Sequence, residues 1–521
     1  MLGIAGWLLG CAGVASAGNG AVIADKPVNL ILITIDTLRA DRLGCYGYRR
    51  ATSPNLDRFM SRGTRFEWAF SSASYTAPSH ISLLTGLYPS FNSVMLDNGR
   101  FFKLSGKTVT LAEQCRDAGM RTAAVISNPT LNRRLGLHQG FALYVDLQFD
   151  RVHERYLPKE ATATTQEALE ILNQVHDAPF FLWVHYQDPH GPYSPPCDLT
   201  TFAEAAPPPE KDRILPVGAD TSGYKAIPTY QVIEEERAAW RYGLRYDNEI
   251  LYLDRHIQTL FDRVDELGLT RNTVIVLTSD HGEAFSEDEF FFAHSHSVGL
   301  DQVRVPLAIV GPGVPAGKVM TTPIGGVDVY ATMTEMIGLK PVEKTSGRSW
   351  AAAVRAGKEP EEKPVFCEGF SQRGVAFRGM YYREDRRPAD SPIWKISPTT
   401  NGKHLPLGPS LVRLSDGAGI EASKGALLRA ELDAFTLAAE QAIRETFDEL
   451  VRRGKDERTV AENNGLVFFR DELGYEFDLR DLEPASPEEL SPEDRAQRRA
   501  MSSLGYLEKA PEEEPADKPK P

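Results

Sequence analysis

Hydrophobic residues recur along this chain with two different spacings, and the alternation of these two patterns predicts its fold. Short β-branched runs predict buried strands, and apolar residues spaced three to four apart predict amphipathic helices. Strands are expected at 29–36, 121–127, 179–186, 273–279 and 304–310. Helices are expected at 54–62, 78–85, 108–118, 161–176, 231–266 and 328–338. Strands and helices that alternate on this scale predict an α/β fold, a mostly parallel sheet covered by helices on both faces.

The pattern changes after residue 360. VFCEGF and GVAFRGMYYR predict short antiparallel strands, and residues 422–454 predict one long amphipathic helix or two, inserted before the apolar run GLVFFRDELGYEFDL. We therefore expect two units, a large domain at 28–358 and a smaller antiparallel α+β subdomain at 359–485.

The two ends of the chain differ from the rest. Residues 1–17, MLGIAGWLLGCAGVASA, are typical of a signal peptide that ends in an A-x-A-like cleavage site. LLGC at 8–11 also resembles a bacterial lipoprotein signal, in which Cys11 would carry the lipid. Residues 486–521 are rich in Glu, Pro and Lys, a composition typical of disorder. We expect an exported protein of the bacterial periplasm, or one anchored to the envelope membrane through Cys11.

The chain has 521 residues, of which 42% are hydrophobic, so it can bury a large core. Its formal net charge is −14. This charge argues against a nucleic-acid partner, because phosphate backbones are bound by clustered Lys and Arg.

Three distant segments carry candidate chemistry. The run NLILITID ends in Asp36, and TVIVLTSDH ends in Asp280 and His281. Thr76 lies in SYTAPSHISLLTG, two residues before a proline and at the start of an apolar helix pattern. Buried parallel strands that end in carboxylate and imidazole groups are one way in which an open α/β sheet builds a metal site. The alternatives are a strand-end capping role for the acidic residues and a helix N-cap role for Thr76.

Several motifs, from about residue 28 to about residue 485, resemble the sulfatase family of the alkaline-phosphatase superfamily. They are ITIDTLRADRLGCYG, TSPNLDRFMSRGTRFEWAFS, TAPSHISLLTGLYP, FFLWVHYQDPHGPYSPP, YDNEILYLDRHI, TSDHGEAF, HSHSVGLDQVRVPLAIVGPG, GVDVYATMTEMIGL and GYEFDLRDLEPASPEEL. Because they occur in the family's order, the resemblance implies the family's large sheet and its smaller C-terminal subdomain. It does not by itself identify a substrate.

The resemblance also implies a divalent metal. Asp36, Asp280 and His281 match metal-ligand positions of the family, and Thr76 matches the nucleophile that contacts the metal. In family members, a second aspartate often follows directly after the aspartate that corresponds to Asp36. In this chain that next position is Thr37. Calcium-using relatives often have Asp-Asn where this chain has Asp280–His281, and imidazole suits Mn or Zn better than Ca. We expect Mn or Zn, with Ca as the alternative.

The nucleophile segment departs from the family pattern. Active sulfatases carry Cys or Ser at the position of Thr76, and this residue is oxidised to formylglycine. The arginine of that motif is replaced here by His80, and the lysine and histidine of a second family motif correspond to Ser127 and Asn128. We expect His80 and Asn128 to bind substrate.

A threonine cannot form formylglycine, so it lacks the second hydroxyl with which that group expels sulfate. Relatives in the superfamily that cleave or transfer phosphate esters use Thr or Ser directly. Thr76 therefore favours hydrolysis of a phosphoester, or transfer of a phospho group, by a metal-activated hydroxyl.

The resemblance assigns histidines to the same site. His190 in DPHGPY matches a substrate-contacting residue, and His296 matches the residue that protonates the leaving group. His185 is interpreted either as a substrate contact or as a buried structural residue. His294 is interpreted either as a residue that contacts the ligands of the site or as an exposed residue, with exposure favoured. Asp247 is expected to be structural rather than a ligand of a second metal.

Two classes of function remain open. The first is a metal-dependent hydrolase or transferase, with a true sulfuric ester hydrolase as a variant; the second is an inactive relative that binds a sulfated or phosphorylated ligand. The substrate is expected to be a small-molecule, glycan or lipid head-group ester. Apart from Cys11 the cysteines are Cys45, Cys115, Cys197 and Cys367, whose spacing matches no zinc motif.

Overall fold

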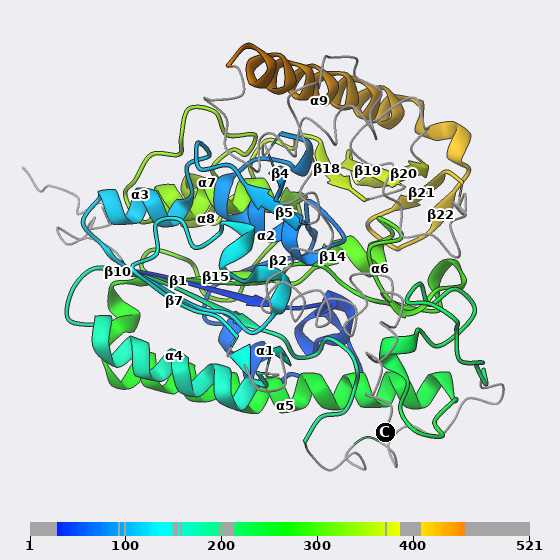
Figure 1. Ribbon diagram of the computed structural model, residues 1–521, viewed down its shortest axis with the longest axis horizontal. Coiled ribbons are helices and arrows are strands. Elements are labelled where there is room, and N and C mark those ends of the chain that lie inside the picture. Colours follow the sequence, from blue (N-terminus) through cyan, green and yellow to red (C-terminus); the bar gives the residue numbers. More distant parts are fainter. Residues whose placement is uncertain are drawn as a thin grey trace, which may run out of the picture.

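A large sheet with a smaller sheet beside it forms the framework of the protein (Figure 1). The computed structural model describes residues 29–91, 94–97, 101–147, 149–150, 155–156, 159–196, 202, 213–369, 372–385 and 408–453. The expectations for residues 1–17, Cys11, Cys197, the run 465–479 and the tail 486–521 lie outside these residues.

The large sheet has eight strands, in the spatial order β16-β2-β15-β11-β1-β10-β6-β7. In chain order they are β1 (Asn29–Ile35), β2 (Thr64–Phe66), β6 (Arg121–Val125), β7 (Leu143–Val145), β10 (Phe180–Tyr186), β11 (Thr273–Ser279), β15 (Leu307–Val310) and β16 (Lys318–Met320). The five strands from β11 to β7 are parallel, and β15 is antiparallel to both neighbours. The predicted mostly parallel sheet is confirmed.

Helices cover both faces of this sheet, as predicted. Figure 1 shows α4 and α5 below it and α2, α3, α7 and α8 above it. The helices are α1 (Pro54–Met60), α2 (Thr76–Thr85), α3 (Leu111–Asp117), α4 (Ala161–Val175), α5 (Ala239–Glu266), α6 (Leu300–Val303), α7 (Gly326–Met336), α8 (Ala351–Ala356) and α9 (Ala426–Arg452). Among the described residues, no helix is long and apolar enough to cross a membrane.

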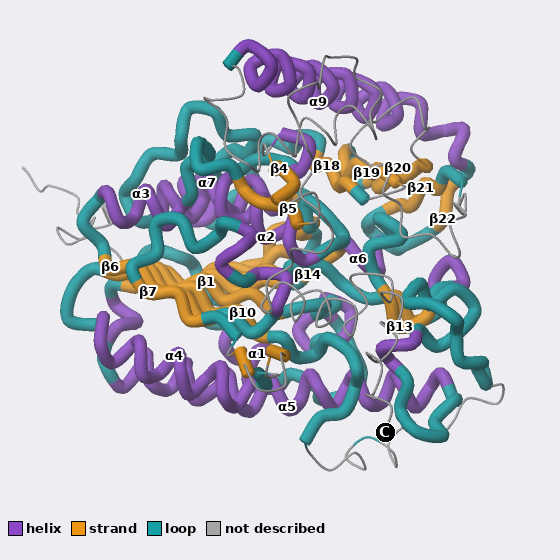
Figure 2. Tube along the Cα trace, viewed as in Figure 1, coloured by secondary structure: helices purple, strands orange, loops and turns teal. Residues whose placement is uncertain are grey.

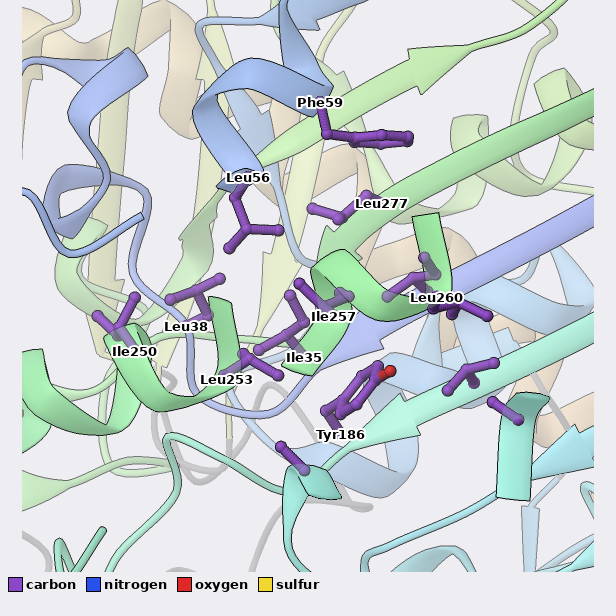
Figure 3. Close-up of a cluster of buried hydrophobic side chains, with 14 of the residues drawn as sticks. Ile35, Leu38, Leu56, Phe59, Tyr186, Ile250, Leu253, Ile257, Leu260 and Leu277 are labelled. Carbon is purple, nitrogen blue, oxygen red and sulfur yellow. The ribbon is translucent and has the colours of Figure 1, made fainter. Parts of the chain in front are cut away.

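The lower face of the sheet is sealed by a continuous apolar layer. Figure 3 shows side chains from β1, the loop after it, β10 and β11 packed against α1 and α5. They include Ile35, Leu38, Leu56, Phe59, Tyr186, Ile250, Leu253, Ile257, Leu260 and Leu277. All ten are almost completely buried. Each fully buried side chain of this kind stabilises the fold by roughly 1.5–3 kcal/mol. The layer therefore fixes the positions at which β1 and β11 end.

Two predicted boundaries are wrong, for different reasons. The strand expected at 304–310 is divided into β14 (Arg304–Val305) and β15 by Pro306, which has no N–H for a strand ladder. The helix expected at 231–266 begins only at Ala239. Tyr230 and Gln231 both donate side-chain hydrogen bonds to the carbonyl oxygen of Phe292, and these tertiary contacts hold the preceding segment out of the helix.

The expected antiparallel subdomain is present as a five-stranded sheet. Its strands are β18 (Val365–Glu368), β19 (Gln372–Phe377), β20 (Met380–Asp385), β21 (Ser410–Arg413) and β22 (Gly419–Ile420). Helix α9 lies along this sheet at the top of Figure 2. Leu428 and Leu432 of α9 are buried against Val375 and Tyr382 of the sheet. The helical signal at 422–454 is therefore confirmed as a 3-10 turn (Ala422–Gly425) followed by α9.

The remaining short strands lie in loops. They are β3 (Ala69–Phe70), β4 (Val94–Asp97), β5 (Phe101–Leu104), β8 (Phe149–Asp150), β9 (Arg155–Tyr156), β12 (Ala284–Phe285), β13 (Phe291–Ala293) and β17 (Ile324–Gly325). Strands β14, β3 and β17 form a three-stranded sheet of their own. Of the described cysteines, Cys45, Cys115 and Cys367 are free thiols.

A buried carboxylate on α5 fixes the start of α1. Both oxygens of Asp254 accept hydrogen bonds from the first turn of α1, including 2.8 Å bonds from the backbone nitrogen of Leu56 and from Nδ2 of Asn55. We expect Asp254→Ala to lower the free energy of unfolding by about 2–3 kcal/mol, because it leaves these helix-terminal N–H groups without acceptors. Urea unfolding of the wild type, Asp254→Ala and Asp254→Asn measures this. An Ala variant as stable as the wild type would contradict the capping role.

Candidate metal centre and nucleophile

The candidate site begins where two neighbouring parallel strands end. β1 and β11 are paired in register, with Ile35 opposite Ser279. Asp36 follows the first strand directly, and Asp280 and His281 follow the second. The register therefore brings the three side chains together, as predicted from the sequence. All three are completely buried.

Their potential ligand atoms face one common point. Nε2 of His281 lies 3.4 Å from Oδ2 of Asp280 and 3.9 Å from Oδ1 of Asp36. One ligand atom from each residue lies within 4.8 Å of the others, the spacing of a group that can hold a metal ion. Two carboxylates and an imidazole make a mixed oxygen and nitrogen donor set.

The hydrogen bonds around these residues fit a cation. Nδ1 of His281 donates to the carbonyl oxygen of Gly282 at 2.9 Å, so its Nε2 presents a lone pair to the centre. Burial lowers the pKa of His281 to about 3, which keeps the ring neutral. Oδ1 of Asp280 accepts from the backbone nitrogens of Thr37 and His281, whereas its Oδ2 has no hydrogen-bond donor among the described residues. A bound cation would satisfy this buried carboxylate oxygen, which lacks a hydrogen-bond donor.

Thr76 brings a hydroxyl group to the same point. It is the first residue of α2, and its Oγ1 lies 3.1 Å from Nε2 of His281. The N-cap of α2 is Tyr75, whose side chain makes no capping hydrogen bond to the helix. The alternative interpretation of Thr76 as an N-cap is therefore wrong. Two contacts around this end of α2 hold it in place, namely the 2.7 Å bond from Oγ of Ser79 to the carbonyl oxygen of Asp280 and the pairing of Oγ of Ser71 with Oγ of Ser79.

The turn between Asp36 and the next loop is strained. Thr37 has a φ of 54°, which a β-branched residue rarely adopts and which costs of the order of 1–3 kcal/mol. Hydrogen bonds on both sides of Thr37 hold this conformation. The N–H of Thr37 donates to Oδ1 of Asp280 at 3.2 Å, and its carbonyl oxygen accepts from the hydroxyl of Tyr246 at 2.7 Å. The buried Oγ1 of Thr37 has no hydrogen-bond partner among the described residues.

His80 lies beneath the site rather than in an open pocket. Nδ1 donates to the carbonyl oxygen of Thr76 at 2.8 Å, and Nε2 lies 3.0 Å from Oγ1 of Thr34, which also accepts from Nε1 of Trp183. The ring is completely buried and burial lowers its pKa. This geometry favours a role in positioning Thr76 over the substrate-binding role predicted for His80.

His185 and Asn128 flank Asp36. Nδ2 of Asn128 donates to Oδ2 of Asp36 at 2.6 Å, and Nε2 of His185 lies 3.7 Å from the same oxygen. His185 is completely buried on β10, so its geometry favours the structural interpretation of the two that the sequence allowed. Asn128 is completely buried as well and orients a candidate metal ligand, while substrate binding by Asn128 stays a prediction.

A histidine that the sequence analysis expected to be exposed lies beside the site. His294 is only 8% exposed, and its ring centroid lies 4.5 Å from that of His281 and 5.2 Å from that of His190. Nδ1 of His294 donates to Oε1 of Glu283 at 3.0 Å, and the hydroxyl of Tyr193 donates to Oε2 at 2.9 Å. The favoured interpretation of His294 as exposed is therefore wrong, because the buried carboxylate of Glu283 holds its ring inside, and the contact with His281 agrees with the other interpretation.

The two histidines predicted from the resemblance are both buried. Nδ1 of His190 donates to the carbonyl oxygen of Gly191 at 2.7 Å. His296 stacks on Phe290 at a centroid distance of 3.6 Å, and its Nε2 lies 2.9 Å from the amide nitrogen of Gln302. Burial lowers the pKa of each ring to about 3, so both are neutral at pH 7 without a ligand.

Asp247 has the structural role expected of it. One oxygen pairs with Arg42 at 3.3 Å, and the other pairs with Arg50 at 2.5 Å and accepts from Tyr48 at 2.7 Å. The described contacts of this carboxylate are with these three residues, so a second metal site with His294 or His296 has no support.

The fold and the strand-end cluster together define the class of the protein as an α/β protein with a candidate metal site at the ends of two parallel strands. A family model described as Sulfatase matches residues 28–339. The chain belongs to the sulfatase family.

Relatives of known name agree with this family. Mouse (Mus musculus) iduronate 2-sulfatase is 28% identical over 355 residues, which cover 58% of this chain and 62% of that protein. The chain thus spans less than two thirds of this relative's length.

Solved structures share the fold at lower identity. A protein solved in complex with its substrate D-glucosamine-2-N,6-O-disulfate has a TM-score of 0.62 at 17% identity, over 81% of this chain and 99% of that chain. The phosphonate monoester hydrolase of Agrobacterium radiobacter has a TM-score of 0.58 at 18% identity, over 80% and 96%. The fold is therefore shared with proteins named for both sulfate and phosphonate esters.

Proposed function

We propose that the protein is a metal-dependent hydrolase or transferase of phosphate-type esters in which Thr76 is the nucleophile. The observation that carries this proposal is the position of the Thr76 hydroxyl, 3.1 Å from Nε2 of His281 within the strand-end cluster. Hydroxyl nucleophiles are activated when an imidazole or a cation lies this close to the oxygen.

Asp36, Thr76, Asp280 and His281 would hold the cation. The imidazole in this set favours Mn or Zn over Ca, which prefers oxygen ligands alone. When bound, a divalent cation would lower the pKa of the Thr76 hydroxyl and neutralise negative charge on the ester.

The chain's own residues then have distinct tasks. Oγ1 of Thr76 would lose its proton to water and form a bond to phosphorus, while the bond from phosphorus to the leaving alcohol breaks. The N–H groups at the start of α2 would stabilise negative charge on the phosphoryl oxygens. A water molecule would then cleave the phosphothreonine and restore the Thr76 hydroxyl; in a transferase, a second alcohol would replace the water.

A protonated histidine would supply a proton to the leaving alcohol. His190 and His296 are the residues that the family resemblance assigns, and His294 is the one that the geometry adds. An anionic ester would raise the low pKa of these rings, because negative charge favours the imidazolium form. His294 has the strongest support for this task, since it contacts His281 and donates to the buried Glu283.

We expect Glu283→Gln to lower kcat by roughly 10- to 100-fold, because the amide cannot stabilise an imidazolium at His294 as a carboxylate does. The loss should be larger for alkyl esters than for aryl esters, whose leaving groups need less protonation. Steady-state kinetics on one ester of each kind measures this. Glu289→Gln is the matched control, because Glu289 is a half-exposed glutamate six residues further along the chain. It should leave kcat unchanged for both esters. Equal losses on both esters would contradict proton donation through His294.

Phosphate is favoured over sulfate because of the residue at the nucleophile position. A sulfated threonine has no second hydroxyl with which to expel sulfate, whereas a phosphothreonine is open to attack by water. A true sulfuric ester hydrolase would need a different route for this step. An inactive binding protein would have no use for the retained group of Asp36, Asp280 and His281.

The alcohol of the substrate is proposed to be a glycan, with a lipid head group or another small molecule as the alternative. Iduronate 2-sulfatase and the protein solved with disulfated glucosamine are named for sugar esters, which supports a glycan. An exported protein, in the periplasm or anchored at the envelope, would meet such substrates outside the cytoplasm.

Turnover of two matched aryl esters, a phosphate and a sulfate, tests this proposal. The protein is stripped of metal and then loaded with Mn, Zn or Ca. We expect cleavage of the phosphate that depends on Mn or Zn. Cleavage of the sulfate alone would contradict the phosphoester assignment. Cleavage of neither ester by protein that binds the metal tightly would favour a binding protein.

A further inference from the structure

Residues 288–297, which we call the histidine segment, have a strained backbone. The segment carries His296 and also His294, whose ring contacts that of His281. Among the described residues, positive φ angles outside glycine are few, and half of them lie in this segment. They belong to Asp288, Glu289, Phe292 and Ser295, with φ of 52°, 64°, 53° and 72°. Such left-handed conformations cost free energy and persist only where tertiary contacts hold them.

Arg383 of β20 connects the two ends of the histidine segment. Its Nη2 pairs with the carboxylate of Asp288 at 2.7 Å, and its Nη1 donates to Oγ of Ser297 at 2.7 Å. Its Nε donates to Oγ of Ser410 on β21 at 3.1 Å, so the guanidinium group is itself held by the five-stranded sheet. Arg383 is only 9% exposed, and water therefore competes little for these bonds.

Gln372 of β19 holds the same end of the segment. Its Oε1 accepts from Oγ of Ser297 at 3.1 Å, from the backbone nitrogen of Val298 at 3.2 Å and from Nη1 of Arg383 at 3.1 Å. The hydroxyl of Tyr381 donates to the carbonyl oxygen of Val298. Gln372, Ser297 and Val298 are completely buried. Side chains of β19 and β20 thus fix the point at which the chain leaves the segment.

The beginning of the segment is held from another direction. The backbone nitrogen of Phe291 donates to the carbonyl oxygen of Gly223 at 2.9 Å. The carbonyl oxygen of Phe292 accepts from Tyr230 and Gln231, as described above. These contacts precede the two histidines in the chain, whereas the contacts with β19 and β20 follow them. The histidines therefore lie between two fixed points of a strained backbone.

We propose that Arg383, supported by Gln372, is a positioning residue that keeps His294 and His296 in place for proton donation to the leaving alcohol. The described hydrogen bonds of Arg383 reach none of the four candidate metal ligands, so it acts through the histidine segment. Without the guanidinium group the two ends of the segment lose their connection, and the strained backbone can relax. The effect on proton donation rests on the proposed function, whereas the holding of the segment does not.

Arg383→Met tests this role, because it removes the guanidinium group and keeps an unbranched side chain. We expect hydrogen exchange, measured by mass spectrometry, to become roughly tenfold faster or more in peptides of the histidine segment and to stay unchanged in β1 and β11. For an alkyl phosphate, kcat should fall roughly tenfold or more. For an aryl phosphate, whose leaving group needs less protonation, it should fall less than about threefold.

Two further variants complete the comparison. Arg413→Met is the matched control, because Arg413 is an exposed arginine of the same sheet that pairs with Asp416. It should change neither exchange nor kcat. Ser297→Ala removes the hydroxyl shared by Arg383 and Gln372, and it should speed exchange in the same peptides. This smaller change also tests the proposal if Arg383→Met does not fold.

Thermal melting with and without Mn or Zn checks that each variant is folded and still responds to metal. The inference is overturned if exchange of the histidine segment is unchanged in folded Arg383→Met and Ser297→Ala. It is also overturned if kcat falls equally for both esters, or if Arg383→Met loses the metal response. Wild type that cleaves neither ester would refute the proposed function instead, and the exchange measurement would then decide alone whether Arg383 holds the segment.

Discussion

Thr76→Ala is expected to abolish phosphoester cleavage, with a loss in kcat of the order of 10³-fold or more. The variant removes the oxygen that forms the bond to phosphorus, while the methyl group of Ala fits at the first position of α2. The fold should not change, because Tyr75 rather than Thr76 is the N-cap of the helix. Turnover of the aryl phosphate with Mn or Zn measures the loss.

Thr76→Ser is the matched control, because it keeps the hydroxyl and removes only a methyl group. It should retain turnover within about one order of magnitude of the wild type. If Thr76→Ala cleaved the phosphate at a rate close to that of the wild type, another group would have to be the nucleophile.

Asp280→Asn is expected to remove both metal binding and turnover. In the wild type, a cation at 100 times its Kd stabilises the folded state by about 2.7 kcal/mol, which raises Tm. The Asn variant lacks the buried carboxylate that accepts the cation, so its Tm should not respond to Mn or Zn. Asp247→Asn is a useful contrast, because that carboxylate pairs with Arg42 and Arg50 and should leave the metal response intact.

Asp280→Asn should also change how the stability of the metal-free protein depends on pH. Burial raises the pKa of Asp280 to about 6, above its value in the unfolded chain. A raised pKa means that the folded state binds the proton more tightly, so this contribution to stability is present below about pH 4 and is lost as the pH rises through 6. Metal-free wild type should show this decline in thermal melts, and Asp280→Asn should lack it. Equal pH profiles, or a metal response that persists in the variant, would contradict the assignment.

The strand-end part of the site could be predicted from sequence because it depends on local pattern. A buried β-branched run that ends in a carboxylate specifies both the strand and the place where it delivers its side chain. Asp36 and Asp280 follow this rule, and the pairing of β1 with β11 brings them together. The parallel sheet and its helical cover follow from the same periodicity.

The histidines could not be predicted in the same way, because their roles depend on tertiary partners. His294 is held inside by Glu283, eleven residues earlier in the chain, and by contact with His281. For His80 a signal was available. It follows Thr76 by four residues, and in a helix this spacing brings its ring to the Thr76 carbonyl oxygen. The start of α5 at Ala239 likewise depends on the distant carbonyl of Phe292.

The most direct measurement of the central claim is mass spectrometry of the peptide that contains Thr76. The metal-loaded protein is mixed with an aryl phosphate, quenched with acid within the first turnover and digested. We predict a phosphoryl group on Thr76 that appears before steady state, decays when substrate is exhausted and is absent from Thr76→Ala. Turnover of the phosphate with no modified Thr76 at any time, or with the group on another residue, would contradict a threonine nucleophile.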